Sequence, residues 1–295
     1  MSVSTRPIRF SAADGYELAG ELFLPPGRPV GQVLVAAAMG VPRRYYGPFA
    51  TFLAEAGLQT LAFDYRGIGG SAPPRLRGFP ARLEDWATLD LPAAAAELRR
   101  HGDAPLFWLG HSVGGQLFGL TEGLDVRGAL FVASQSGYWR NWETPRGRLA
   151  IFAFFWGLVP ALTLLLGKLP MRLLGQGEDL PAGVARQWAA WGRDPDYVLG
   201  HARRTRGLEH FDYRGPMRFY AIADDPYAPP RTVERLHGFF PHAAGELRVV
   251  EPAALGVPRI GHFGPFRPTF RETLWPELRS FFLSRAGVEI EAAVR

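Results

Sequence analysis

One serine in this chain has the surroundings of a nucleophile. Ser112 lies in the sequence Gly-His-Ser-Val-Gly, with Gly110 two residues before it and Gly114 two residues after it. The apolar run 105–110 predicts a buried strand, and residues 114–123 predict a helix. A serine on such a turn is held in a strained backbone above the end of the sheet, beside a helix N-terminus that favours negative charge. The two glycines would let strand and helix approach each other.

A serine hydroxyl needs a general base, and the base needs an acid to orient it. Of the seven histidines in the chain, His262 has the most suitable setting. It lies in a loop rich in glycine and proline, between the last predicted strand and the last predicted helix. His111 adjoins the serine, but we expect it to point away and to be structural. The others lie in helical, arginine-rich or loop segments: His101, His201, His210, His237 and His242.

Two adjacent aspartates are candidates for the acid. The strand predicted over 216–224 runs directly into Asp224 and Asp225. Serine, then aspartate, then histidine is the chain order required of a nucleophile on a strand-to-helix turn. The turn, the acid and the histidine are independent features, and together they predict a serine hydrolase.

The elements that must position these residues alternate between strands and helices. A hairpin is predicted over 6–24, from two runs joined by Asp14 and Gly15. Further strands are predicted over 31–40, 58–65, 105–110, 126–134, 216–224 and 245–251, and helices over 45–57, 83–100, 114–123, 229–240 and 268–284. This alternation predicts an α/β fold, with a mostly parallel sheet covered by helices on both faces.

The alternation stops once, from residue 137 to residue 210. This stretch is rich in Trp, Phe and Leu and shows no strand-like alternation. It predicts an inserted group of helices, which forms a cap (137–210) on a core made of residues 1–136 and 211–295.

These features resemble the α/β-hydrolase superfamily, in particular serine hydrolases with a Gly-His-Ser-x-Gly-Gly turn, such as the monoacylglycerol-lipase and serine-aminopeptidase-like branch. Residues Asp64–Ser71 are similar to the family loop Asp-x-Arg-Gly-x-Gly-x-Ser. We expect Asp64 to hold that loop by hydrogen bonds. In the family the acid opens an Asp-x-x-Ala-Pro pattern, which residues 225–229 match, so the resemblance favours Asp225 over Asp224. It also implies a helical cap inserted after the sixth strand.

One departure from the family pattern concerns the oxyanion hole. The family carries His-Gly after its third strand, whereas here Met39 replaces the histidine and Gly40 is kept. The resemblance implies that the backbone N–H groups of Val41 and Val113 bind the oxyanion, since Pro42 has no N–H. Methionine in place of the family's histidine does not remove the backbone N–H of Val41.

The resemblance and the residues together imply acyl transfer in two steps. Ser112 attacks a carbonyl, His262 takes its proton, Asp225 orients the imidazole, and water then hydrolyses the acyl-enzyme. We expect a carboxylic ester hydrolase acting on a small molecule, without a metal or organic cofactor. Alternatives are an acyltransferase or an amidase or aminopeptidase on the same scaffold, or a membrane-associated lipid-binding protein without catalysis.

The cap is the segment in which substrate choice is expected to lie. Its apolar side chains either contact an apolar acyl or alcohol group, or only pack the cap against the core. Three residues after the oxyanion loop either contact a polar substrate group or are solvated: Arg43, Arg44 and Tyr45.

Composition excludes several other classes. The net charge is +5, with Lys168 as the only lysine, and the arginines are spread along the chain rather than clustered. No nucleic-acid partner is therefore expected. The absence of cysteine excludes disulfides and thiolate metal sites. Residues 1–10 lack the apolar core of a signal peptide, so we expect a cytoplasmic location.

Residues 149–167 form an apolar run long enough to suggest a membrane span. A spanning helix would separate Ser112 from His262, so we expect none. Pro160 disfavours a helical conformation at Val159 and predicts two short helices instead. They either roof the acyl pocket or make a peripheral contact with a lipid surface.

Overall fold

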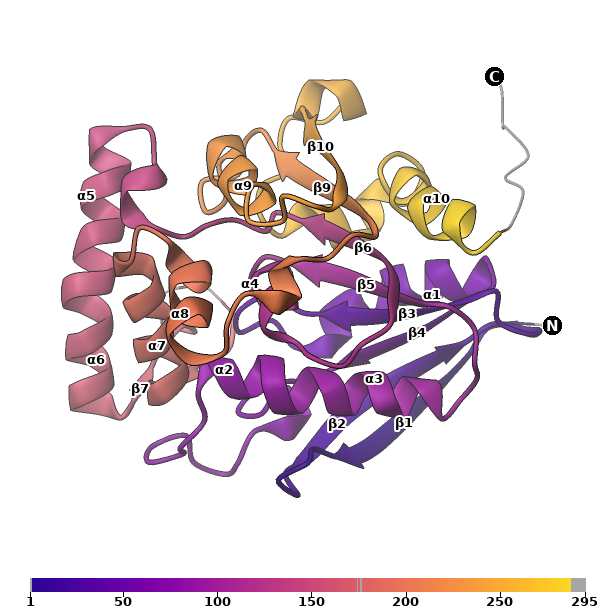
Figure 1. Cartoon of the computed structure of the whole chain (residues 1–295), viewed down its shortest axis with the longest axis horizontal. Coiled ribbons are helices and arrows are strands. Elements are labelled where there is room, and N and C mark those ends of the chain that lie inside the picture. The colour runs from indigo at the N-terminus through magenta and orange to yellow at the C-terminus, as the bar shows by residue number, and fades with distance from the viewer. Residues whose placement is uncertain (1, 174, 176, 288–295) are drawn as a thin grey trace.

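The computed structural model describes residues 2–173, 175 and 177–287, and these form the predicted α/β fold (Figure 1). Within that range the main sheet has the strand order β1-β2-β4-β3-β5-β6-β9-β10. The hairpin strands β1 and β2 are antiparallel, and β2 is antiparallel to β4, whereas the strands from β4 to β10 pair in parallel. The strand bounds are Ser4–Ser11 (β1), Glu17–Leu24 (β2), Gly31–Ala36 (β3), Leu58–Phe63 (β4), Leu106–His111 (β5), Val126–Val132 (β6), Pro216–Ile222 (β9) and Ala244–Val250 (β10).

The central strands are apolar because helices cover them on both sides (Figure 1). Strands β3, β4 and β5 are buried over their whole length, as is usual for parallel strands between two helical layers. In one layer α1 and α10 pack together, and the rings of Phe49 and Trp275 lie 5.1 Å apart. The helix bounds are Gly47–Glu55 (α1), Leu83–Asp85 (α2), Leu91–Arg99 (α3), Val113–Gln116 (α4), Pro230–His237 (α9) and Trp275–Arg285 (α10).

The helix after Ser112 is shorter than the predicted range 114–123. Helix α4 ends at Gln116, and a 3-10 turn follows over Phe118–Leu120. Four glycines in the predicted range lower its helix propensity. Gly119 also lies directly against Phe211, whose ring would be 2.3 Å from a Cβ placed there. Close packing therefore decides the local structure here.

The chain leaves the sheet after β6 and returns at β9, as the resemblance implied. The helices between these strands gather at one end of the sheet, on the left in Figure 1. They are α5 (Pro145–Ala153), a π-helical turn (Phe154–Leu158), α6 (Val159–Leu166), α7 (Ala182–Arg193) and α8 (Tyr197–Thr205), with a small antiparallel pair of β7 (Lys168–Leu169) and β8 (Leu180–Pro181). We call residues 137–210 the insertion.

The predicted break at Pro160 is wrong, because α5, the π-turn and α6 form one continuous helix over Pro145–Leu166. In the π-turn the N–H of Val159 bonds to the carbonyl of Phe154, five residues back. Pro160 directly follows this turn, and the shifted hydrogen bonds accommodate its missing N–H inside the continuous helix. By length and composition alone this helix could cross a membrane, yet both of its ends lead back into the same fold.

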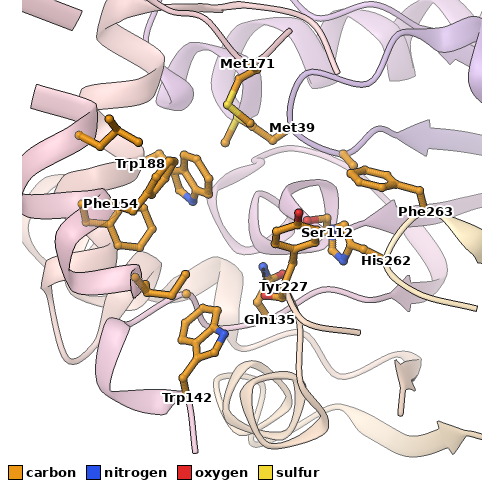
Figure 2. Close-up of a pocket in the computed structure, with 15 residues that line it drawn as sticks. Met39, Ser112, Gln135, Trp142, Phe154, Met171, Trp188, Tyr227, His262 and Phe263 are labelled. Atoms are coloured by element: carbon orange, nitrogen blue, oxygen red, sulfur yellow. Dashed lines mark hydrogen bonds between the residues drawn. The ribbon is translucent and has the colours of Figure 1, made fainter. Parts of the chain in front are cut away.

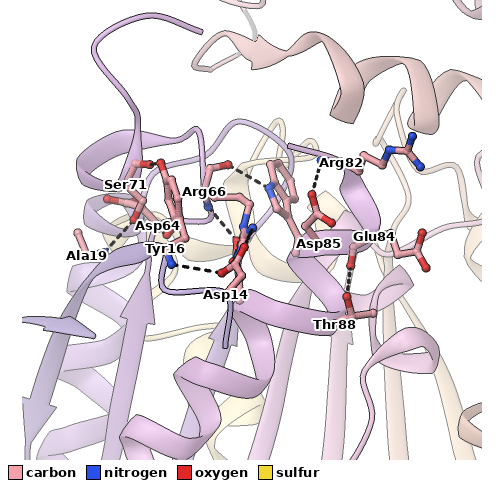
Figure 3. A network of polar contacts seen from close by, with 12 residues as sticks. Asp14, Tyr16, Ala19, Asp64, Arg66, Ser71, Arg82, Glu84, Asp85 and Thr88 are labelled. Atoms are coloured by element: carbon pink, nitrogen blue, oxygen red, sulfur yellow. Dashed lines mark hydrogen bonds and ion pairs between the residues drawn. The ribbon is translucent and has the colours of Figure 1, made fainter. Parts of the chain in front are cut away.

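The loop after β4 is held by buried carboxylates, as predicted for Asp64. The carboxylate of Asp64 accepts hydrogen bonds from the backbone N–H groups of Arg43, at 2.6 Å, and Gly70, at 2.8 Å. The guanidinium of Arg66 lies between Asp14 and Asp90, with 2.7 Å to each carboxylate (Figure 3). Burial raises the pKa of Asp90 to about 7, against the opposing effect of Arg66. The same loop contacts the insertion, because the N–H of Gly69 donates to the carboxylate of Glu178 at 2.7 Å.

Candidate active site

Ser112 occupies the predicted turn between β5 and α4. Its backbone has a positive φ of 52° with ψ of −116°, a combination outside the regions allowed for most L-residues and therefore strained for a serine. A Cβ at Gly114 would lie 1.9 Å from the carbonyl oxygen of Ala36, and one at Gly110 would lie 2.7 Å from Gly115. Both positions therefore require glycine, which confirms the structural reason for the motif.

His262 and Asp225 form a buried pair. The imidazole Nδ1 lies 2.6 Å from the Asp225 Oδ2 atom. The second carboxylate oxygen of Asp225 accepts the N–H groups of Tyr227, at 2.8 Å, and Ala228, at 3.0 Å. Asp225 is thereby fixed and fully satisfied, with one oxygen directed at the imidazole.

The neighbouring Asp224 has a different partner. Its carboxylate accepts the N–H groups of Ile260, at 3.0 Å, and Gly261, at 2.9 Å. These residues begin the loop that carries His262. Of the two aspartates, Asp225 thus contacts the histidine, and Asp224 anchors the loop that presents it.

His111 is buried and does not line the cavity described below, as expected for a structural residue. Its Nε2 donates to the main-chain carbonyl of His262 at 3.0 Å, and its Nδ1 lies 2.8 Å from the Tyr46 hydroxyl. That hydroxyl also accepts the N–H of Ala38 at 2.8 Å. A neutral imidazole satisfies all of these bonds, and burial holds the pKa of His111 well below its usual range.

Tyr46 was not singled out by sequence reasoning. Its hydroxyl joins the loop after β3 to the histidine beside Ser112, so one side chain connects two parts of the site. A tyrosine in a helical segment gives no signal of such a contact, because its partners are distant in sequence.

Ser112 and His262 both line a cavity of about 330 Å³ (Figure 2). In Figure 2 the two side chains lie on one side of it, and Phe154 and Trp188 of the insertion lie opposite. The wall is mainly apolar and consists of Ala38, Met39, Ser112, Gln135, Gly137, Trp142, Ile151, Phe154, Phe155, Leu158, Met171, Trp188, Tyr227, His262 and Phe263. The insertion supplies about half of this wall, so its aromatic residues contact whatever the cavity holds.

The loop after β3 differs from the expectation for the oxyanion donor. The N–H of Val41 already donates to the carbonyl of Ala38 at 3.1 Å, and Val41 does not line the cavity. Met39 does line it, and within the described residues its N–H has no hydrogen-bond acceptor. Val113 is the first residue of α4, where a backbone N–H has no partner within the helix.

The three residues that follow this loop do not line the cavity. Arg43 pairs with Asp64, Arg44 lies 3.4 Å from Glu178, and the Tyr45 hydroxyl donates to the carbonyl of Phe263. The backbone N–H of Glu178 also donates to the carbonyl of Gly40 at 2.7 Å. The insertion is thus joined directly to the loop after β3.

Among the described residues there is no cluster of three or more His, Cys, Asp or Glu side chains able to hold a metal ion.

The mostly parallel sheet, its covering helices and the insertion after β6 define the α/β-hydrolase fold. A family model described as "Serine aminopeptidase, S33" matches residues 27–195, more than half of the chain, and the chain belongs to that family. A comparison with curated proteins finds no match.

Solved structures of esterases share the fold. An esterase from Pyrococcus furiosus has a TM-score of 0.60 at 17% identity, with 96% of this chain and 91% of that chain covered. A thermostable carboxyl esterase from Bacillus coagulans has a TM-score of 0.61 at 14% identity, covering 97% and 99%. An esterase from Exiguobacterium antarcticum has a TM-score of 0.59 at 17% identity, covering 96% and 100%. At such identities the likeness concerns the fold.

Proposed function

We propose that this protein is a serine hydrolase that cleaves a carboxylic ester with an apolar acyl or alcohol group. The observation that carries the proposal is the buried pair of His262 and Asp225, at 2.6 Å, on the same cavity as Ser112. A base held by a carboxylate beside a serine on a strained turn is the arrangement that activates a hydroxyl. Esterase activity of similar folds agrees with this choice.

The reaction proceeds in two steps. Ser112 Oγ attacks the ester carbonyl carbon while His262 accepts the hydroxyl proton, and Asp225 stabilises the imidazolium. The tetrahedral intermediate collapses, the C–O bond to the alcohol breaks, and His262 returns the proton to the leaving oxygen. Water then attacks the acyl-enzyme with His262 again as the base, which releases the carboxylic acid and restores Ser112.

The backbone N–H groups of Met39 and Val113 are our candidates for the oxyanion hole. Met39 replaces Val41 in this role, because the Val41 N–H is already bonded to Ala38. Each such donor contributes about 3 kcal/mol of barrier reduction in serine hydrolases. The methionine side chain is also placed on the cavity wall.

The cavity wall favours an ester over a peptide with a free amino terminus. Binding a terminal ammonium calls for a carboxylate, and the described residues of the wall include no Asp or Glu. Its aromatic and aliphatic groups suit a hydrocarbon chain instead. We propose that the insertion acts as a cap and that the hydrocarbon chain of the substrate lies between the insertion and Ser112.

The test combines an active-site probe with a substrate series. A fluorophosphonate probe should label the protein at Ser112, and p-nitrophenyl esters should be hydrolysed by the wild type but not by Ser112→Ala. Product analysis with added alcohol separates hydrolysis from acyl transfer. Equal ester turnover by Ser112→Ala, or no labelling of the folded wild type, would overturn the proposal.

A further inference from the structure

The continuous helix Pro145–Leu166, which we call the surface helix, presents an apolar stripe to the outside. Of the 18 residues that form the most apolar part of this helix, only 17% are buried. The most exposed large side chains are Leu149 (68%), Trp156 (52%), Leu164 (76%) and Leu165 (69%). Leu149, Trp156 and Leu164 follow one another at intervals of seven and eight residues, which places them on one side of the helix, and Leu165 adjoins Leu164 at the edge of this stripe. In Figure 1 this helix forms the outer margin of the insertion, away from the sheet.

Aromatic rings and arginines alternate beside this stripe. The guanidinium of Arg140 lies 4.8 Å from the centre of the Trp139 ring, and Arg193 lies 5.1 Å from that of Trp156. Between them, the ring of Phe152 meets that of Trp139 edge-to-face, with 5.1 Å between ring centres, and stacks on that of Trp156 at 5.7 Å. Tryptophans and arginines with an apolar body and a polar or charged end are typical of the interface between lipid tails and headgroups.

Cationic side chains also lie at both ends of the surface helix. Arg146 is exposed in its first turn. At the other end, beside Leu166, the lining of a cavity of about 420 Å³ includes the basic residues Arg75, Arg77, Lys168 and Arg172 and the acidic residues Glu178 and Asp179. Lys168 is paired with Asp179 at 2.7 Å, and Arg172 lies 3.6 Å from Glu178. The basic side chains outnumber the acidic ones, so this end attracts anions.

We propose that the surface helix docks on an anionic lipid bilayer and lies in the plane of its headgroups. The apolar stripe enters the acyl boundary, and the flanking arginines contact lipid phosphates. The helix length of about 33 Å for 22 residues would suit either orientation, since the hydrocarbon core of a bilayer is about 30 Å thick. The opposite side of the helix excludes a spanning position, because Phe155 and Val159 are buried against the protein.

Charge favours a membrane over a second copy of this chain. A two-fold dimer through the stripe would bring the arginine-rich borders of both copies together, where like charges repel. An anionic bilayer matches both the apolar stripe and its basic borders.

The docked surface helix would lie between the lipid and the cavity. The substrate class inferred from this position rests on the proposed function. The inner side of the helix supplies Ile151, Phe154, Phe155 and Leu158 to the cavity wall. Leu158, on the π-turn, lines the cavity and is also 40% exposed. We therefore assign an ester with an acyl chain, drawn from the bilayer, as the substrate class.

Vesicle flotation tests the docking. The full chain should float with vesicles of phosphatidylcholine and about 30% phosphatidylglycerol, and bind pure phosphatidylcholine vesicles at least about tenfold more weakly. Leu149→Asp/Leu165→Asp should reduce binding to the anionic vesicles by more than about tenfold, since charged residues enter the acyl boundary at high cost. Val249→Asp is the matched control, because Val249 is 49% exposed on the edge strand β10, outside the stripe.

Two further measurements keep the outcomes distinct. Ser112→Ala should float like the wild type, so docking is measured independently of catalysis. Fluorophosphonate labelling of the Leu149→Asp/Leu165→Asp variant in solution should equal that of the wild type, which shows that it is folded. No flotation of the wild type, equal flotation of that variant, or a wild-type dimer that this variant converts to monomer would overturn the docking.

Discussion

The imidazole of His111 donates a hydrogen bond to the main-chain carbonyl of His262 at 3.0 Å. The residue before the candidate nucleophile thus holds the loop that carries the candidate base. Because the Tyr46 hydroxyl completes the chain to the N–H of Ala38, three loops of the site share one buried polar network. Such a network holds the three loops in fixed positions relative to one another, and replacing any one member weakens the remaining hydrogen bonds.

Acid should weaken the fold through His111. Burial lowers its pKa in the folded state, so it is neutral there, whereas the unfolded chain takes up a proton below about pH 6.5. Its stabilising contribution is therefore present above pH 6.5 and is lost as the pH falls, by up to about 1.4 kcal/mol per pH unit. In His111→Gln the unfolding free energy, measured with urea, should lose this dependence between pH 7.5 and 5.5. A wild-type-minus-variant difference that does not change with pH would contradict the assignment.

The two adjacent aspartates should differ sharply in their effect on activity. Asp225→Asn should lower kcat by roughly 10⁴-fold, since an amide no longer holds the imidazole in its reactive tautomer. Asp224 binds Ile260 and Gly261 through different oxygens, so Asp224→Asn keeps only one of these two bonds, and because Asp224 does not contact His262 it should lower kcat less than about tenfold. Ester hydrolysis by both purified variants, with melting temperatures to confirm folding, makes the comparison. Equal losses would mean that the pair acts as one unit.

Gly114 should tolerate no side chain. A Cβ there would lie 1.9 Å from the carbonyl oxygen of Ala36, so Gly114→Ala must displace either β3 or α4. We expect a loss of at least about 3 kcal/mol in unfolding free energy, or failure to fold. Gly27→Ala is the control, because no atom lies within 4 Å of its added Cβ. A melting temperature of Gly114→Ala within a few degrees of that control would be inconsistent with this geometry.

The insertion should set acyl-chain preference. Phe154 lines the cavity, so Phe154→Ala enlarges it and should raise kcat/KM for a decanoate relative to a butyrate ester by about tenfold. Phe152, two residues earlier, is exposed on the outer side of the same helix, and Phe152→Ala should leave that ratio unchanged in detergent-free solution. The ratio, measured with p-nitrophenyl esters, does not depend on enzyme concentration. A shift in the control, or none in Phe154→Ala, would place the acyl chain elsewhere.

Much of the site could be predicted from local patterns. The glycines around Ser112 are required by contacts within one strand-turn-helix unit, so their spacing is visible in the sequence. His262 was distinguished by its glycine- and proline-rich loop, and its pairing with Asp225 agrees with the Asp-x-x-Ala-Pro pattern. Strand and helix order followed from hydrophobic periodicity, which reports which faces are buried.

Other features depend on the exact backbone geometry of a turn or on contacts between distant segments. Whether the Val41 N–H is available is decided by the turn of the loop after β3, in which Ala38 accepts it. Pro160 is accommodated by a π-turn that shifts the hydrogen bonds by one residue. The roles of Tyr46 and Glu178 depend on partners far away in sequence.

The sequence by itself determined the order of strands and helices, the turn at Ser112 and the family of the protein, because each of these follows from short-range patterns. Only the tertiary structure decided which side of the helix Pro145–Leu166 faces the cavity and which faces outward. A helix that is apolar on all sides has no periodicity from which a buried face can be inferred. Packing of one side of this helix against the cavity therefore determines which of its apolar residues form the exposed stripe.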